Sequence, residues 1–181
     1  MTWRPFQLNP TMPKDGMDRT AYLEAKFGSL DSFRQLEEHV QVAGASERIT
    51  FAFEKIARTP NTFAAHRLIW FGAQESCQNA VVDSLFQGYF EEGADIGSIP
   101  TLVGLATRAG LNQVCVERMF QSDEGTADVK TEEAAGHKLG IRGVPYFIVN
   151  GTYAISGAQP VETFVSTLKR VAADGAGRKA G

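Results

Sequence analysis

The residues of this sequence best suited to chemistry are its two cysteines, Cys77 and Cys115, and its three histidines. The cysteines are too far apart in the sequence to form the C-x-x-C pair of a thiol–disulfide centre or half of a zinc site. Each falls on the apolar face of an expected helix, which predicts a buried structural thiol. His39, His66 and His137 show no short spacing to the cysteines, so we expect no metal site.

The composition narrows the classes of protein to which the chain can belong. It has 181 residues, 43% of them hydrophobic, and a net charge of -3, which is typical of one globular domain. With 18 Lys and Arg against 21 Asp and Glu, it lacks the basic excess of a nucleic-acid-binding protein. Arg4 and Pro5 interrupt the apolar core that a secretory signal needs. We expect a cytoplasmic protein that binds neither nucleic acid nor membrane.

The first third of the chain changes pattern several times. Residues 3–8 contain Trp, Phe and Leu before the turn-prone Asn9-Pro10 pair, which predicts a strand. From Asp18 to Val42 the apolar spacing predicts two helices separated by Gly28. The segment 49–53 alternates with period two, which predicts a strand or an extended segment.

A block of helices follows. The Pro60-Asn61-Thr62 triplet is a helix start signal, and the apolar residues after it recur at helical spacing. The expected helices cover residues 63–71, 77–90, 99–109, 114–120 and 122–139.

The last part of the chain returns to strand patterns. Residues 143–149 predict a strand that ends at the Asn150-Gly151 hairpin signal, with residues 152–155 as its antiparallel partner. A final helix begins at Pro160, and residues 175–181 are expected to form a flexible tail. The order of elements predicts an α/β protein with an all-helical insertion.

Four segments together resemble a known family. They are WRPFQLNP (3–10), IARTPNT (56–62) with AHR (65–67), LGIRGVPYFIVNG (139–151) and ISGAQP (155–160). In combination they resemble the FrnE-type branch of the DsbA-like thioredoxin superfamily, whose relatives include 2-hydroxychromene-2-carboxylate isomerases and kappa-class glutathione transferases. The resemblance covers essentially the whole chain. It implies a thioredoxin-like fold in two parts, 1–58 and 123–174, around a helical insertion at 59–122, with 175–181 as the tail.

In that family, a first strand and a first helix precede the WRPF segment. The helix carries C-P-W-C or a serine variant at its N-terminus, where the free N–H groups and the helix dipole lower a thiol pKa. Neither element is found before Trp3. We therefore expect a truncated or mis-started sequence with no catalytic residue in this chain. The missing central strand would leave open sheet edges, through which two copies can pair.

The resemblance also implies a set of binding residues. Pro145 would be cis after Val144, turning the Val144 N–H and C=O outward to pair with an extended substrate or with glutathione; the alternative is an ordinary trans turn. Asn61 would be an N-cap whose free amide meets the ligand. His66 would face the same groove, or else pack against Trp70.

The loop before the last helix is the remaining candidate. Ser156, Gly157 and Gln159 precede a helix N-terminus, which favours anion binding. In glutathione-binding relatives this loop holds the ligand with a Ser-Asp pair, and Gln159 stands where the acid is expected. That departure favours the FrnE-type side.

The residues and the resemblance are compatible with three functions. The first is a DsbA/FrnE-like thiol–disulfide oxidoreductase, inactive as given, whose partner is a thiol or disulfide peptide or a small-molecule thiol. The second is a glutathione-dependent isomerase or transferase. We expect no cofactor for this chain, unless it binds glutathione in that second function. The third is a non-catalytic binding module. The coding sequence upstream of Met1 would discriminate among them.

Overall fold

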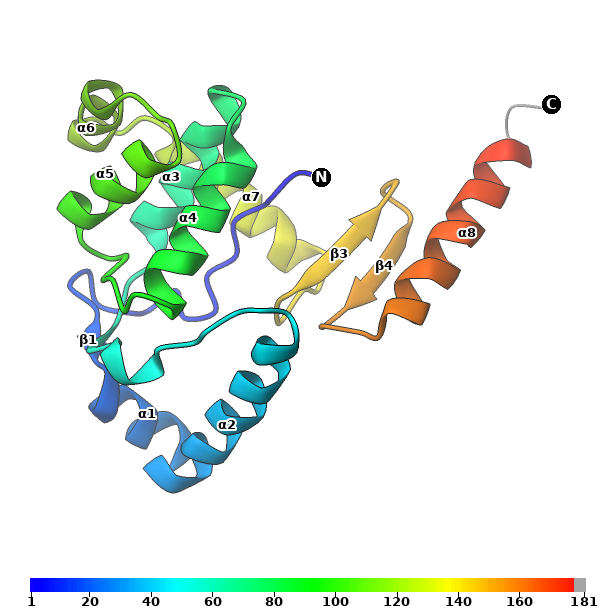
Figure 1. The fold of residues 1–181 in the computed structure, drawn as a ribbon. Coiled ribbons are helices and arrows are strands. Elements are labelled where there is room, and N and C mark those ends of the chain that lie inside the picture. The colour runs from blue at the N-terminus through cyan, green and yellow to red at the C-terminus, as the bar shows by residue number, and fades with distance from the viewer. Residues whose placement is uncertain (178–181) are drawn as a thin grey trace. The chain divides into compact units, whose positions relative to one another are not determined.

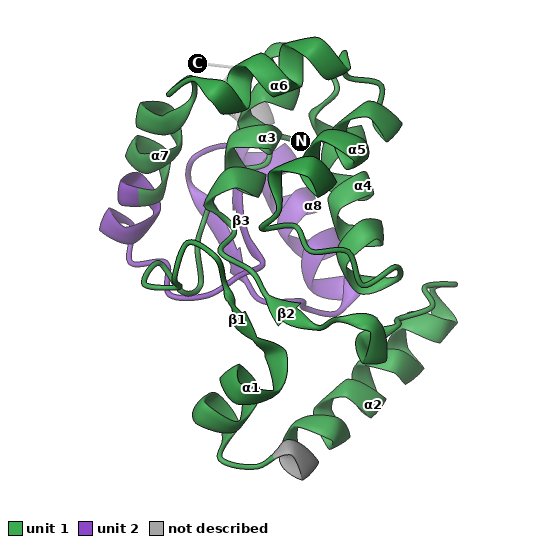
Figure 2. Ribbon diagram, turned by 90° about the vertical axis from the view of Figure 1, so that its left-hand side faces the viewer, with its two compact units in different colours: residues 1–133 green, residues 134–181 purple. Residues whose placement is uncertain are grey.

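The computed structural model describes residues 1–177, apart from the side chains of residues 30–32 and 175–177. The chain divides into two compact units, residues 1–133 and 134–181, coloured separately in Figure 2. These units group 1–58 with the helical segment, and the division predicted at 58/59 and 122/123 stays a prediction. Residues 178–181 of the predicted tail lie outside the described residues.

The first unit begins with an irregular segment and a short two-stranded sheet. β1 (Met17–Asp18) pairs antiparallel with β2 (Arg58–Thr59). α1 (Arg19–Phe27) follows. It begins after Asp18, whose carboxylate accepts a hydrogen bond from the Ala21 N–H at 3.0 Å and so caps the helix. It ends at Gly28, whose φ of 78° is left-handed. α2 (Leu30–Ser46) runs back alongside α1, as Figure 1 shows.

Helices form the rest of the first unit. α3 (Phe63–Gln74), α4 (Gln78–Phe90), α5 (Ile99–Arg108) and α6 (Gln113–Gln121) gather around one apolar core (Figure 1). α7 (Thr126–Lys138) begins in this unit and ends in the second. The core is built from the apolar stripes of the four gathered helices, which is why the helical spacing predicted it. Its most deeply buried members include Leu68, Val81, Leu102, Val116 and Met119.

The second unit is a hairpin followed by a helix. β3 (Tyr146–Val149) and β4 (Tyr153–Ser156) pair antiparallel, with Phe147 opposite Ile155. Asn150 and Gly151 at the turn have positive φ angles of 50° and 67°. α8 (Val161–Gly177) packs on the hairpin, where the Phe147 and Phe164 rings meet edge to face at 4.9 Å.

The strand predicted at residues 3–8 is wrong, and of the two alternatives predicted at 49–53, a strand or an extended segment, the structure excludes the strand. Residues 3–8 alternate between more buried and more exposed side chains but belong to no strand, because their backbone bonds recorded in the structure go to side chains of α3, α4 and α7. Residues 49–52 are loop, and a 3₁₀ turn, η1 (Phe53–Lys55), follows them. The Ala52 N–H donates to the Phe90 carbonyl at the end of α4, so this loop is tied to a helix and not to a strand.

No helix among the described residues is long and apolar enough to cross a membrane.

Candidate functional site

The loop before β3 contains the first pair of candidate residues, Val144 and Pro145. The peptide bond between them is cis. The Gly157 N–H donates to the Pro145 carbonyl at 2.8 Å, so the loop is fixed to the residue that follows β4. The Val144 side chain is 46% exposed.

The hydrogen-bond pattern of the hairpin shows which backbone groups remain available. Pro145 and Gly157 are bonded directly across the hairpin, and in an antiparallel pair bonded and non-bonded positions alternate. Phe147 therefore bonds to β4, whereas the N–H and C=O groups of Tyr146 and Ile148 point away from it. Within the described residues β3 pairs only with β4. Tyr146 and Ile148 thus form an open strand edge directly after the loop.

The loop before α8 brings Ser156, Gly157 and Gln159 next to this pair. Ser156 lies opposite Tyr146 in the hairpin, and Gly157 has a positive φ of 82°. The Gln159 side-chain amide donates to the Ser156 carbonyl at 2.9 Å, and its backbone N–H donates to the Gly157 carbonyl at 3.1 Å. The Gln159 backbone N–H and one side-chain N–H are therefore used within the loop.

Asn61 lies in the first unit and does not have the free amide expected of it. Its side-chain nitrogen donates to the Met12 carbonyl at 2.7 Å, and its side-chain oxygen accepts from the Phe63 N–H at 2.9 Å. Thr62 occupies the N-cap position of α3. The prediction of a free N-cap amide is wrong, because a backbone carbonyl far away in the sequence takes that amide.

His66 lies one turn into α3 and is hydrogen-bonded to the backbone of Phe6. Burial lowers the pKa of His66 to about 4, and the bond to Phe6 opposes part of that effect. The imidazole is therefore neutral near pH 7. Trp70, the alternative neighbour of His66, packs against Gly125, where an added Cβ would be 2.5 Å from the indole ring.

The residues that hold the N-terminal segment were not among the predicted site residues. The Trp3 N–H donates to the Gln78 side-chain oxygen at 3.1 Å, and the Gln78 side-chain nitrogen donates to the Trp3 carbonyl at 3.1 Å. The Trp3 indole donates to Asn79 at 2.8 Å, and the Gln7 N–H donates to the Glu133 carboxylate at 3.2 Å. No sequence pattern signals side-chain bonds to a distant backbone.

Arg67 belongs to the AHR motif and has a structural role that the sequence does not indicate. Its guanidinium donates to the carbonyls of Met119 at 2.9 Å, Ser122 at 2.7 Å and Glu124 at 2.8 Å. These carbonyls belong to the end of α6 and the loop after it, and the Met119 carbonyl also accepts from the Ser122 N–H and hydroxyl. Arg67 therefore fixes the path from α6 into α7.

Both cysteines are free thiols that pack against the first unit's core. They are half-buried rather than fully buried as predicted; Cys77 is the N-cap residue of α4, and Cys115 lies in the first turn of α6. Burial and the negative charge of Glu75 raise the pKa of the Cys77 thiol, which keeps it protonated near neutral pH. The described residues contain no cluster of three metal-ligating side chains.

The predicted site residues thus form two groups. Val144, Pro145, Ser156, Gly157 and Gln159 meet in the second unit, and Asn61 and His66 lie near the N-terminal segment in the first.

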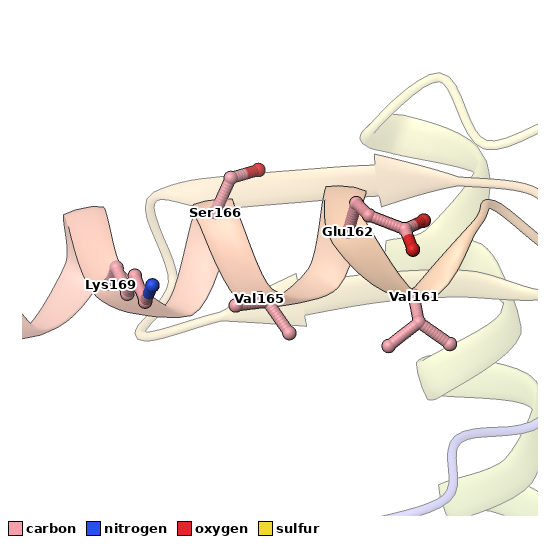
Figure 3. A pocket seen from close by; sticks show the side chains of 5 residues that line it. All are labelled: Val161, Glu162, Val165, Ser166 and Lys169. Atoms are coloured by element: carbon pink, nitrogen blue, oxygen red, sulfur yellow. The ribbon is translucent and has the colours of Figure 1, made fainter.

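A surface hollow of about 340 Å³ lies along α8, and Figure 3 shows the side chains that line it. All of its lining residues, Val161, Glu162, Val165, Ser166 and Lys169, come from this one helix. It is a surface groove without polar groups converging from several elements, so we assign no ligand to it.

Comparisons with known proteins add the following. The model of the DSBA-like thioredoxin domain matches residues 1–169. The crystal structure of a probable DsbA oxidoreductase from Streptomyces coelicolor is similar, with a TM-score of 0.83 and 29% identity over 92% of this chain and 73% of that one. A 2-hydroxychromene-2-carboxylate isomerase shares the fold, with a TM-score of 0.66 and 16% identity over 90% and 81% of the two chains. No curated protein matches the chain.

Proposed function

Because the chain belongs to the DSBA-like thioredoxin domain family, we propose that it is a FrnE-type member of the DsbA oxidoreductases whose hairpin binds an extended thiol or disulfide peptide. Its fold is the thioredoxin-like fold of that family with a helical insertion, as the similarity to the Streptomyces coelicolor structure shows. The observation that supports peptide binding is the open β3 edge. The backbone groups of Tyr146 and Ile148 there are free to pair with an added strand.

We infer that these 181 residues do not cycle a disulfide on their own thiols. Cys77 and Cys115 belong to different helices, and the Cys77 thiol has a raised pKa. A redox centre needs a low-pKa thiolate and a second thiol within disulfide distance. Turbidity of insulin with dithiothreitol should develop at the same rate with and without the chain, and an acceleration lost in Cys77→Ser or Cys115→Ser would contradict this inference.

Peptide is favoured over glutathione by the loop before α8. A γ-glutamyl ligand presents an ammonium that needs a carboxylate, and Gln159 offers none. Its amide is also bonded to the Ser156 carbonyl. In our proposal Val144 and Pro145 place the substrate backbone, Ser156 and Gly157 border it, and Asn61 and His66 hold the first unit's N-terminal segment.

The binding proposal can be tested with a matched pair of proline variants. Ile148→Pro removes one N–H from the open edge of β3 without removing a bond to β4. Ala154→Pro does the same on the outer edge of β4, directly opposite Ile148. A short cysteine-containing peptide of β-branched residues should shift the amide resonances of Tyr146 and Ile148 in the unaltered chain.

We expect Ile148→Pro to abolish these shifts at the remaining edge residues and Ala154→Pro to keep them. Oxidised glutathione serves as the second probe and should shift neither edge. Equal peptide binding by both variants would overturn the edge proposal, and stronger binding of glutathione than of peptide would support the isomerase or transferase reading instead.

A further inference from the structure

The asparagines of this chain differ in how their side chains are held. Four of the five accept or donate a hydrogen bond. The partners are Thr11 for Asn9, Met12 and Phe63 for Asn61, Trp3 for Asn79 and Cys115 for Asn112. Among the described residues, Asn150 is the asparagine whose side chain has no recorded hydrogen bond, and it is exposed. Its amide is therefore free to rotate.

Asn150 is also the asparagine that precedes a glycine. The backbone nitrogen of Gly151 can attack the Asn150 side-chain carbonyl carbon, because a bond between these two atoms closes a five-membered ring. Glycine has no Cβ to obstruct that approach. Both residues are exposed, and an added Cβ on Gly151 would meet nothing within 4 Å, so the turn is open to water.

The surrounding hairpin gives the turn freedom to reach a reactive geometry. β3 and β4 are four residues each and form a two-stranded sheet. Two-stranded hairpins are only marginally stable, and their ends open more readily than packed cores. The turn bonds recorded here, from the Thr152 N–H to the Val149 carbonyl and from the Thr152 hydroxyl to the Asn150 carbonyl, are 3.2 and 3.3 Å long. Neither involves the Asn150 amide or the Gly151 nitrogen.

We propose that Asn150 is the site at which this chain is modified by spontaneous deamidation. The Gly151 nitrogen loses its proton and bonds to Cγ of Asn150, and the Cγ–Nδ2 bond breaks, so that the nitrogen takes up a proton and leaves as ammonia. Water then opens the resulting succinimide. Attack at one carbonyl gives aspartate, and attack at the other gives isoaspartate, in which the main chain runs through the former side chain. No electron is gained or lost.

The product changes the hairpin. Isoaspartate adds a backbone carbon to a turn in which Asn150 and Gly151 both have positive φ, and it adds a negative charge. A longer turn no longer matches the register that places Val149 opposite Tyr153. We expect the converted molecules to lose the order of β3 and β4. This inference stands apart from the proposed function and holds whatever ligand the hairpin binds.

The test incubates the folded chain in mildly alkaline buffer and follows the peptide 143–169 by mass spectrometry, with an isoaspartyl methyltransferase assay for the rearranged product. Asn150 should convert to a mixture of aspartate and isoaspartate while Asn79 and Asn112 stay intact in the same sample. Conversion at Asn150 no faster than at these internal controls would overturn the proposal. Conversion in the urea-unfolded chain but not in the folded chain would overturn it too, because the turn would then protect the asparagine.

Two substitutions separate the chemistry from the fold. Gly151→Ala places a Cβ beside the attacking nitrogen and should slow conversion severalfold, although its positive φ strains the turn. Gly151→Asn also blocks the approach but tolerates positive φ, so the hairpin keeps its form. Both should convert more slowly than the unaltered chain at position 150. An unchanged rate in Gly151→Asn would show that the Gly151 nitrogen is not the nucleophile and would refute the mechanism.

Discussion

Acidification should weaken the first unit through His66. The pKa of this imidazole is lowered from 6.5 to about 4 in the folded chain, because burial disfavours its charged form. The unfolded chain therefore binds more protons than the folded chain as the pH falls through this window. The free energy of unfolding is therefore not reduced by His66 above pH 6.5. It decreases as the pH falls from 6.5 to about 4, and the full loss is reached below that pH. At 1.36 kcal/mol per pKa unit, the loss is about 3 kcal/mol.

Urea unfolding followed by tryptophan fluorescence measures this loss, since Trp3 and Trp70 both belong to the unit that contains His66. Carboxylates also titrate in this range, so the matched control is His66→Gln, a neutral side chain that can still donate to the Phe6 backbone. The difference in unfolding free energy between the two proteins should change by about 3 kcal/mol from pH 7 to pH 4. The His66 ring resonance, identified by its absence in His66→Gln, should titrate near pH 4. A midpoint near 6.5, or a difference that does not vary with pH, would refute the reasoning.

Further substitutions test the packing and the open edge. Gly93→Ala should destabilise the fold by about 1 to 3 kcal/mol, because φ is +73° and the added Cβ would be 2.5 Å from Lys55. Gly104→Ala, in α5 with nothing within 4 Å of the added Cβ, should instead stabilise the fold by about 0.5 to 1 kcal/mol. Equal changes in the thermal midpoint of the two variants would contradict this. Arg67→Lys should lower the free energy of unfolding in urea by about 1.5 to 3 kcal/mol, because an ammonium does not span three carbonyls as a guanidinium does. A variant as stable as the unaltered chain would show that these bonds contribute little. The open β3 edge predicts a concentration-dependent dimer in analytical ultracentrifugation that Ile148→Pro reduces and Ala154→Pro does not; dimers equal in both variants would exclude pairing through β3.

The helices and the hairpin could be predicted from the sequence because each depends on a local sequence signal. The apolar stripe of α4, the Gly28 stop of α1 and the Asn150-Gly151 turn depend on neighbours a few residues away, and the structure has all three. The strand predicted at 3–8 failed for the opposite reason. Alternation indicates which side chains face inward, but a strand also needs a neighbouring strand to pair with. The Trp3 N–H instead donates to the Gln78 side chain.

The candidate site shows the same division. The loop residues 144–145 and 156–159 meet because a hairpin brings its own ends together, which turn chemistry predicts. Asn61 was misjudged because its partner, the Met12 carbonyl, lies outside any local pattern. The backbone bond and lowered pKa of His66 depend on how deeply a neighbouring segment covers it, which depends on the whole tertiary arrangement.

The pairing of Gln78 with Trp3 has a consequence for how sequences of this kind vary. One side-chain amide both accepts from and donates to the same backbone residue, so position 78 needs a donor and an acceptor at that reach, which glutamate and leucine do not provide. Position 3 contributes only its main chain to this contact, and every residue except proline supplies that. The contact therefore restricts position 78 and not position 3, where the Trp3 indole has a separate bond to Asn79. A search for covarying pairs would miss a contact that links the two positions in space.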